Sequence, residues 1–337
     1  MSAGGRPAGG PVAPRGSRGA AGPGRRAGPQ RRPRVVYVMG SGRSGSTVLG
    51  VTLGNCEGMF YAGELDTWLA RAGEPVLGGL ERTRFWRSVR AQMRDEAEEL
   101  FGEDARRHVE RASALLRPDR WRRRRGLQPR FRRVTGDLYR AILAVSGEDY
   151  VVDSSHFPLR ALELQAIPEL ELHLIFLYRD PHSVVASFAR LIRRQDVAER
   201  RRRELATNLN LWVTTLLSLL VFARQPRSRR MMLRHENFLA DPEGVVGEIL
   251  RRVGSSAAVP ELGALSTGLP LKGNRLLRLE RIAVRAKAPR APRRSRLTTL
   301  LQLPWTIAVS RLSPTVGGDA KVADAGATGR PAARERA

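Results

Sequence analysis

Residues 35–47 constrain the fold more than any other part of the chain. The run at 35–39 reads Val-Val-Tyr-Val-Met, which is a continuous β-prone sequence typical of a central strand in a parallel sheet. A glycine-rich turn follows at once, and then a stretch of helical character at 47–55. A helix that starts after such a turn presents backbone N–H groups and the positive end of its dipole. The segment therefore predicts an anion-binding turn at the edge of an α/β sheet.

The same order recurs three times further along the chain. Each time a short apolar run ends in a charged residue, Asp153, Arg179 or Arg234, and a helical stretch follows. The expected strands are 150–152, 172–178 and 231–233, and the expected helices are 158–167, 181–192 and 242–253. Repeated strand-then-helix order predicts an α/β fold with a central parallel sheet. Residues 73–144 look helical and very basic, and we expect them to form a helical insertion over the sheet.

Both ends of the chain have compositions that cannot build a core. Residues 1–33 are rich in Gly, Pro, Ala and Arg and lack periodicity, and residues 318–337 have the same character. We predict that both segments are disordered tails. The folded domain is then expected at 34–285, with a C-terminal helical extension at 286–317.

The charge of the chain is high but carries little functional information. The 337 residues hold 59 Lys and Arg against 33 Asp and Glu, a formal net charge of +26, and only three of the basic residues are lysines. Heavy use of Arg, Ala and Gly can follow from genome base composition. Aromatic residues make up 6% of the chain and do not interleave with the basic runs, so no nucleic-acid partner is expected. A basic protein still attracts small polyanions.

Several features bear on the compartment. Cys56 is the only cysteine, which excludes an internal disulfide framework. No apolar run precedes Val35, which argues against a secretory signal. The longest apolar stretch, 209–222, is interrupted by Asn210 and by hydroxyl residues, and we interpret it as a buried helix too short and too polar to span a membrane. We expect a cytoplasmic protein with no stable membrane insertion.

The glycine-rich turn reads Gly-Ser-Gly-Arg-Ser-Gly-Ser-Thr over residues 40–47. Its glycines fit the dinucleotide fingerprint G-x-G-x-x-G, and Glu64 lies near the position of the ribose acid. The turn also approaches the P-loop pattern, but Ser46 occupies the position of the lysine that a nucleoside triphosphatase needs. All these interpretations share an anion held by backbone N–H groups, to which the turn adds one arginine and several hydroxyls.

The stretch Arg43-Ser44-Gly45-Ser46-Thr47 resembles the 5′-phosphosulfate loop of sulfotransferases that use 3′-phosphoadenosine-5′-phosphosulfate (PAPS). The pattern of that loop is basic-Ser-Gly-[Ser/Thr]-[Thr/Ser]. The resemblance implies that these five residues bind the phosphosulfate end of PAPS and that Arg43 stabilises the charge growing on the leaving 5′-phosphate. It also implies a three-layer, P-loop-like fold.

A second motif of the same family is matched at 177–188. Arg179 ends an expected strand, and Ser187 follows it by eight residues, on a helix that starts near Pro181. This spacing resembles the family's 3′-phosphate motif. It suits an anion because a ligand between a strand end and the next helix can contact both side chains. NAD has no 3′-phosphate, so the motif favours PAPS over the alternative, a Rossmann-type NAD(P)-dependent oxidoreductase. We expect Arg43 and Arg179 to bind opposite ends of one co-substrate.

A third similarity lies near the end of the expected domain. The run Lys272-Gly273-Asn274-Arg275 resembles the family's loop that closes on the 3′-phosphate side. The resemblance implies that Gly273, Asn274 and Arg275 contact the co-substrate.

Two residues compete for the role of general base, which transfer to an acceptor hydroxyl requires. Glu64 lies in Tyr-Ala-Gly-Glu-Leu and resembles the Gly-Glu carboxylate of bacterial and protein-tyrosine sulfotransferases. His156 stands where many bacterial members have lysine in an Asp-Ser-Ser-Lys stretch, and it also resembles the histidine base of cytosolic sulfotransferases. We prefer Glu64 as the base and expect His156 to contact the bridging oxygen or the acceptor.

The resemblance covers residues 35–285 and implies a sulfotransferase that moves a sulfuryl group from PAPS to an acceptor hydroxyl by in-line displacement. No Cys or His cluster has the spacing of metal ligands, and the family needs no metal, so none is expected. No pattern in the sequence identifies the acceptor or the oligomeric state.

Overall fold

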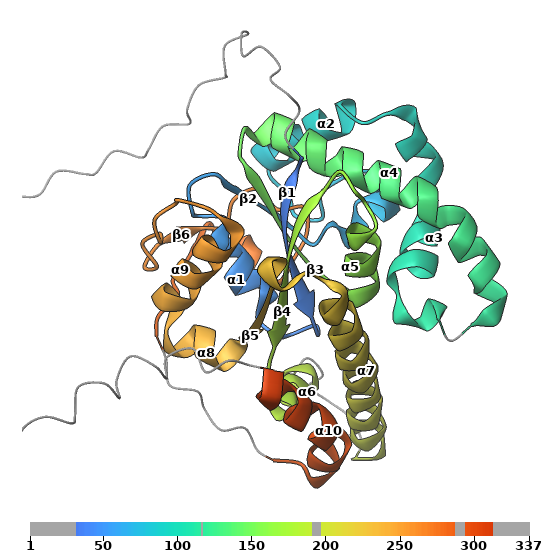
Figure 1. Cartoon of the computed structure of the whole chain (residues 1–337), viewed down its shortest axis with the longest axis vertical. Helices are drawn as coiled ribbons and strands as arrows, with labels where there is room; N and C mark the ends of the chain where they lie inside the picture. The colour runs from blue at the N-terminus through green and yellow to red at the C-terminus, as the bar shows by residue number, and fades with distance from the viewer. Residues whose placement is uncertain (1–31, 116, 191–196, 287–293, 313–337) are drawn as a thin grey trace, which may run out of the picture. The chain divides into compact units, whose positions relative to one another are not determined.

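A computed structural model of the chain describes residues 32–115, 117–190, 197–286 and 294–312. Five parallel strands form one sheet in the order β2-β3-β1-β4-β5 (Figure 1). They are β1 (Arg34–Gly40), β2 (Met59–Gly63), β3 (Tyr150–His156), β4 (Glu171–Tyr178) and β5 (Arg230–Arg234). Because all five strands run the same way, their carboxyl ends lie along one edge. The predicted central parallel sheet is confirmed.

Helices cover both faces of the sheet, and β1 shows how the two cores are divided. Tyr37 and Met39 pack into one apolar cluster, whereas Val36 and Val38 pack into another on the opposite face. The first cluster contains α4 (Trp121–Ser146), α5 (Pro158–Gln165) and α7 (Val197–Arg224); the second contains α1 (Ser46–Leu53) and α9 (Pro242–Val253). The arrangement is a three-layer α/β, P-loop-like fold, as predicted.

The segment predicted as a helical insertion, 73–144, is largely helical. It contains α2 (Leu80–Ala91), α3 (Glu103–Ala105) and most of α4, with short 3₁₀ and π turns between them. Helix α4 continues two residues past the expected boundary and ends at Gly147, whose left-handed backbone is typical of a helix C-terminus. The insertion is joined to α5 at the fully buried carboxylate of Glu163, which pairs with Arg124 at 2.6 Å and Arg132 at 2.8 Å.

Two strands differ from the sequence-based expectation. The strand expected at 150–152 continues to His156, because the buried polar residues after Val152 find hydrogen bonds inside the fold: Asp153 accepts from the Tyr139 hydroxyl at 2.6 Å. Strand β2 was not predicted at all. It pairs with β3 at the edge of the sheet, so Glu64 follows a strand end and not merely a helix.

The apolar stretch at 209–222 also differs from its prediction. It belongs to the 28-residue helix α7, and its part Glu199–Arg224 is long and apolar enough to cross a bilayer by length and composition, with 33% of the apolar window buried. The apolar stretch is thus part of a longer helix than the sequence indicated. The prediction of a buried helix holds for only part of its surface, since Val221 and Phe222 enter the core while Leu209 and Leu220 are exposed.

Three further helices complete the described fold. Helix α6 (Pro181–Ala189) follows β4, α8 (His235–Ala240) follows β5, and α10 (Arg296–Leu312) lies within the predicted C-terminal extension. A short hairpin is formed by β6 (Leu265–Ser266) and β7 (Arg281–Ile282). The predicted tails lie outside the described residues except for Arg32 and Pro33. The carbonyl of Pro33 accepts a hydrogen bond from Glu171 N at 2.9 Å, so the ordered domain begins slightly earlier than expected.

Candidate functional site

The carboxyl edge of the sheet brings most of the predicted site residues together. Glu64 follows β2, His156 ends β3, the glycine-rich turn at 41–45 follows β1, Arg179 follows β4, and Glu236 lies just beyond β5. The strand order places these positions along the edge in that sequence. Residues separated by more than 170 positions in the chain therefore share one edge of the sheet, where α/β proteins bind their ligands.

The glycine-rich turn has an unusual backbone. Gly45, which precedes α1, has φ 98°, and a β-carbon there would overlap the imidazole of His235. Arg43 also adopts a left-handed conformation, with φ 69°, which an L-residue enters at a cost. No side chain among the described residues caps the start of α1. The first N–H groups of that helix therefore face the turn, as an anion site requires.

Helix α1 lies very close to β2 directly behind the turn. The ring of Tyr61 occupies the space that a side chain at Gly50 would need, and the Cβ of Tyr61 occupies the space that one at Gly54 would need. The Tyr61 hydroxyl shares a hydrogen bond of 3.0 Å with Ser154 Oγ on β3. Only glycine at these two positions allows the helix to approach the strand so closely.

Several buried polar atoms around the turn have no hydrogen-bond partner among the described residues. They include Ser44 Oγ, Arg179 Nε and His235 Nδ1. Ser44 is fully buried, and the other two side chains approach the same turn. Nearly all buried polar groups in folded proteins are paired, so unpaired donors gathered at one place indicate a binding site. Arginine and hydroxyl donors suit an anion.

The two predicted anion motifs touch each other. Arg43 Nε donates to Ser187 Oγ at 3.3 Å, and Arg179 Nη1 donates to the carbonyl oxygen of Arg43 at 2.8 Å. Asp180 accepts from Ser183 N at 2.7 Å and so caps α6, the helix that carries Ser187. The side chain of Arg43 thus reaches across to the second motif in this structure.

Arg179 and its neighbour Glu236 are held in a partly dry environment. Burial lowers the pKa of the Arg179 guanidinium, and the nearby carboxylate of Glu236 opposes that shift. Glu236 Oε1 in turn accepts from Asp180 N at 3.0 Å. Burial also lowers the pKa of His235 to about 4, with Arg179 as a second cause, so this imidazole is neutral at neutral pH.

The opposite end of the edge, beside β2 and β3, contains a network of paired charges. Lys272 Nζ lies 3.0 Å from Glu64 Oε2 and 3.6 Å from Asp66 Oδ1. Arg106 Nε lies 3.0 Å from Asp66 Oδ2, and the carboxylate of Asp66 is fully buried. The amide of Glu64 also donates to the carbonyl of Lys272 at 2.8 Å. Backbone and side chain together fix Glu64 in place.

His156 lies next to this network. Burial lowers the pKa of its imidazole below the ordinary value of 6.5, while Glu64 and Asp66 oppose the shift. Its φ of 60° is left-handed, so the chain turns sharply there from β3 toward α5. A non-glycine residue in that conformation is uncommon and is found disproportionately at functional sites. The structure therefore brings both candidate bases to one place.

Sequence reasoning missed the role of Lys272. The run 272–275 was expected on the 3′-phosphate side, but it lies beside β2, whereas Arg179 follows β4. Gly273 lies near Leu277 and the Tyr61 hydroxyl, and Arg275 is exposed in a short 3₁₀ turn. No local signal reveals an ion pair between residues more than 200 positions apart.

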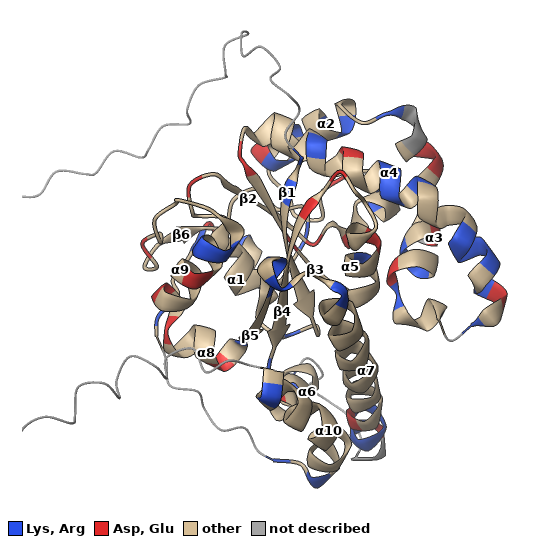
Figure 2. Ribbon diagram, viewed as in Figure 1, with Lys and Arg blue, Asp and Glu red and all other residues tan. Residues whose placement is uncertain are grey.

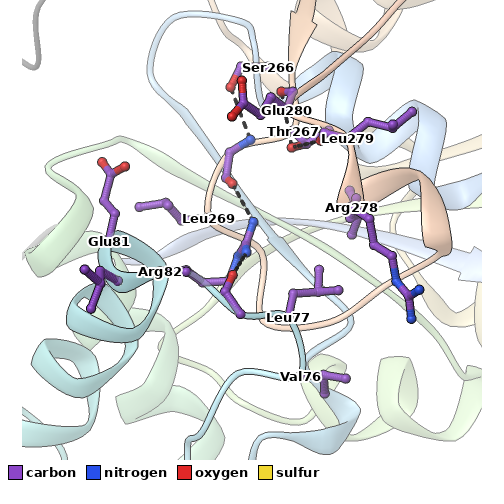
Figure 3. A pocket seen from close by; sticks show the side chains of 15 residues that line it. Val76, Leu77, Glu81, Arg82, Ser266, Thr267, Leu269, Arg278, Leu279 and Glu280 are labelled. Atoms are coloured by element: carbon purple, nitrogen blue, oxygen red, sulfur yellow. Dashed lines mark hydrogen bonds between the residues drawn. The ribbon is translucent and has the colours of Figure 1, made fainter.

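A pocket of about 750 Å³ lies on the outer side of this run, between the start of α2 and the β6–β7 hairpin (Figure 3). Its lining includes Arg82, Leu269 and Arg278. Arg82 Nη2 donates to the carbonyl of Gly268 at 3.2 Å across the pocket wall. None of the predicted site residues lines this pocket. In the described part of the chain, no group of three or more His, Cys, Asp or Glu side chains could hold a metal ion.

Comparison with known proteins adds a family match. The sequence model of a sulfotransferase family matches residues 33–258 of the chain. Among solved structures, the sulfotransferase domain from the curacin biosynthetic pathway is 16% identical, with 82% of this chain and 98% of that chain covered and a TM-score of 0.48. The sulfotransferase domain of the Synechococcus PCC 7002 olefin synthase is 20% identical, with coverages of 83% and 97% and a TM-score of 0.48. Sulfotransferase STF1 from Mycobacterium tuberculosis H37Rv is 18% identical, with coverages of 67% and 68% and a TM-score of 0.41. No curated protein matches the chain.

Proposed function

This chain belongs to the sulfotransferase family, and we propose that it takes a sulfuryl group from PAPS and transfers it to a hydroxyl of an acceptor. The observation that supports PAPS is the group of buried donors without partners, Ser44 Oγ and Arg179 Nε, beside the uncapped start of α1. These donors fit a ligand that carries more than one anionic group. Nothing in the described residues or the comparisons favours the NAD(P) oxidoreductase.

We assign the binding of PAPS to the two neighbouring motifs. The turn residues Ser44, Gly45, Ser46 and Thr47, with the first amides of α1, would hold the 5′-phosphosulfate, and Arg179 with Ser187 would hold the 3′-phosphate. When bound, PAPS supplies an activated sulfuryl group with the 5′-phosphate as its leaving group. Because Arg43 reaches Ser187 at 3.3 Å, it is suited to bridge the two anionic ends as well as to stabilise charge on the 5′ side.

The proton of the acceptor hydroxyl needs a base, and Glu64 is our candidate. Lys272 engages one carboxylate oxygen of Glu64, which leaves the other oxygen to accept a hydrogen bond from an acceptor. His156, whose pKa burial lowers, is neutral at neutral pH and can orient the acceptor hydroxyl. The alternative reverses these two roles. Contacts of Gly273, Asn274 and Arg275 with PAPS stay a prediction.

Thermal-shift assays and calorimetry test the proposal. Adenosine 3′,5′-bisphosphate should raise the melting temperature and bind the full chain, while NADH should do neither, because ligand that binds only the folded state stabilises it. A shift with NADH but not with the bisphosphate would reject PAPS as the donor. A screen of hydroxyl compounds with radiolabelled PAPS would then identify the acceptor class.

A further inference from the structure

Helices α7 and α10 pack against each other partly through polar residues, in addition to an edge contact between the rings of Trp212 and Trp305. Asn208 and Thr298 are fully buried between them, and Gln302 is 2% exposed. Asn208 Nδ2 donates to Thr298 Oγ1 at 3.1 Å, and Gln302 Nε2 donates to the carbonyl of Asn208 at 2.9 Å. A helix at the surface of a water-soluble domain normally buries mainly apolar residues, so these buried polar pairs are unusual.

Part of the apolar surface of both helices is exposed, although Leu211, Val221 and Val309 are buried. On α10, Leu300 is 73% exposed, Leu303 50% and Ile307 44%. On α7, Leu205, Leu209 and Leu220 are also exposed, at spacings that place them on one side of the helix. We call these six side chains the α7–α10 face. The two helices lie side by side in Figure 1, and Figure 2 shows them without charged residues along most of their lengths.

Basic residues flank the α7–α10 face. Helix α10 has Arg296 at its start, Arg311 in its last turn and no acidic residue. Helix α7 begins with the exposed run Arg200–203 before its leucines appear. Apolar side chains bordered by arginines are complementary to a surface with an apolar interior and anionic headgroups.

The two terminal segments and a second copy of the chain fit the face poorly. The segment 313–337 contains no large apolar residue other than two valines, and segment 1–31 has only Met1 and Val12, so neither has side chains to cover six leucine-sized groups. A second copy would bring a second net charge of +26 and the same arginines against the face. We therefore propose that the α7–α10 face docks peripherally on an anionic lipid bilayer.

The structure favours lying on the bilayer over crossing it. The last turns of α7 are fixed to the sheet, since Val221 and Phe222 pack into the core and Gln165 Nε2 donates to the carbonyl of Val221 at 3.0 Å. A spanning α7 would have to leave these contacts. The polar pairs of Asn208, Thr298 and Gln302 stay satisfied only while the two helices remain together.

The docking face is connected to the carboxyl edge of the sheet through α6. Ser295 N, just before α10, donates to His182 Nδ1 on α6 at 3.2 Å. The same helix carries Ser187 and follows Arg179. Docking would therefore hold the β4 side of that edge near the membrane. The proposed docking is separate from the transfer reaction and requires no assumption about the donor of the sulfuryl group.

Vesicle co-sedimentation of the full chain tests this proposal. The wild-type protein should bind vesicles of phosphatidylcholine with phosphatidylglycerol, bind phosphatidylcholine alone much more weakly, and lose binding at high salt. Leu300→Asp combined with Leu303→Asp should lower the partition coefficient about a hundredfold, at about tenfold for each leucine side chain kept from the bilayer. Arg296→Glu with Arg311→Glu should weaken binding to the anionic vesicles only.

The matched control is Leu80→Asp combined with Leu279→Asp. These leucines are 79% and 54% exposed, close to the 73% and 50% of Leu300 and Leu303, and the charge change is the same. The control should bind like wild type, and circular dichroism should show equal melting temperatures. Failure of wild type to bind at low salt, or equal loss in both double variants, would overturn the proposal. A wild-type dimer in sedimentation velocity that only the Leu300/Leu303 variant dissociates would assign the face to a second copy.

Discussion

The two ends of the carboxyl edge of the sheet differ in how their charged groups are paired. Beside β1 and β4, Arg43 and Arg179 lie within one set of contacts, and buried donors such as Ser44 Oγ have no partner among the described residues. Beside β2 and β3, the acidic groups Glu64 and Asp66 are matched by basic side chains at 3.0 Å. One end has an excess of donors and the other is internally balanced.

This difference suggests that one end of the edge binds the co-substrate and the other end carries out proton transfer. Buried donors without a partner are costly until an anion binds, so the β1–β4 end is suited to hold a co-substrate. A paired and fixed carboxylate beside a neutral imidazole is suited to position a hydroxyl and take its proton. Substitutions at one end should therefore change affinity, and substitutions at the other should change turnover.

The largest expected effect lies at the balanced end. Glu64→Gln should lower turnover by about 10²–10⁴-fold while the affinity for adenosine 3′,5′-bisphosphate stays nearly unchanged, because only proton transfer is lost. Steady-state rates and calorimetry on the same variant measure the two quantities. Full turnover in Glu64→Gln would remove it as the base and break the division between the two ends.

His156 provides the control for this assignment. His156→Asn suits the left-handed backbone at that position better than alanine, so it tests the imidazole with less strain. We expect a smaller loss than for Glu64→Gln. If His156 were the base, turnover would instead collapse in this variant, and wild-type turnover would fall as pH drops through a pKa below 6.5.

The next effect lies at the donor-rich end. Arg179→Ala and Arg43→Ala should each weaken binding of the bisphosphate by about ten- to hundredfold, which corresponds to a charge-assisted contact of about 1.5–3 kcal/mol. Arg275 belongs to the predicted binding residues but lies beside β2, so the affinity of Arg275→Ala for the bisphosphate serves as the comparison for these two variants. Unchanged affinity in both Arg179→Ala and Arg43→Ala would end the assignment of PAPS to this edge of the sheet.

A smaller effect concerns stability at the donor-rich end. His235 has a pKa of about 4 in the folded chain against an ordinary value of 6.5, so the unfolded chain takes up a proton first as pH falls. This group should therefore remove about 2 kcal/mol of stability between about pH 7.5 and about pH 5. Urea titrations at several pH values should show that the free energy of unfolding falls more steeply with falling pH in wild type than in His235→Gln. An equal pH dependence of the unfolding free energy in both proteins would show that His235 is not kept neutral in the folded chain.

The smallest expected effect is at the N-terminus. A chain that begins at Arg32 should keep the wild-type melting temperature, because the composition of residues 1–31 cannot build a core. A chain that begins at Arg34 loses the carbonyl of Pro33, which accepts from β4, and should melt slightly lower. A drop of several degrees in the first chain would show that the segment contacts the domain.

Much of the fold could be predicted because several of its strands have clear local sequence signals. The apolar runs of β1, β4 and β5 are each followed by a charged residue or a glycine turn and then a helix, so the strand ends and Arg179 follow from pattern alone. Edge strand β2 was not found this way, because Met59–Gly63 ends in Ala-Gly and the residue after it is not followed by a long helix. Its identity depends on pairing with β3.

Parts of the site and surface were beyond sequence reasoning for the same reason. The pairing of Lys272 with Glu64 depends on a loop that returns to β2 after about 200 residues. The exposure of Leu209 and Leu220 depends on which side of α7 meets the sheet, whereas the sequence shows only an apolar run. Local pattern determines which elements form, and tertiary contacts decide which of their faces are used.

The close approach of Tyr61 to Gly50 and Gly54 has a consequence for the cost of binding. Helix α1 rests against this ring, so the turn in front of it has little freedom to rearrange. The amide donors of the turn are then already oriented before an anion binds, so binding restricts few additional backbone torsions. Tight binding of a small ligand depends on such savings in conformational entropy as much as on the number of contacts. Gly50 and Gly54 contact no ligand themselves, but by allowing this close packing they would contribute to the affinity of the turn for its anion.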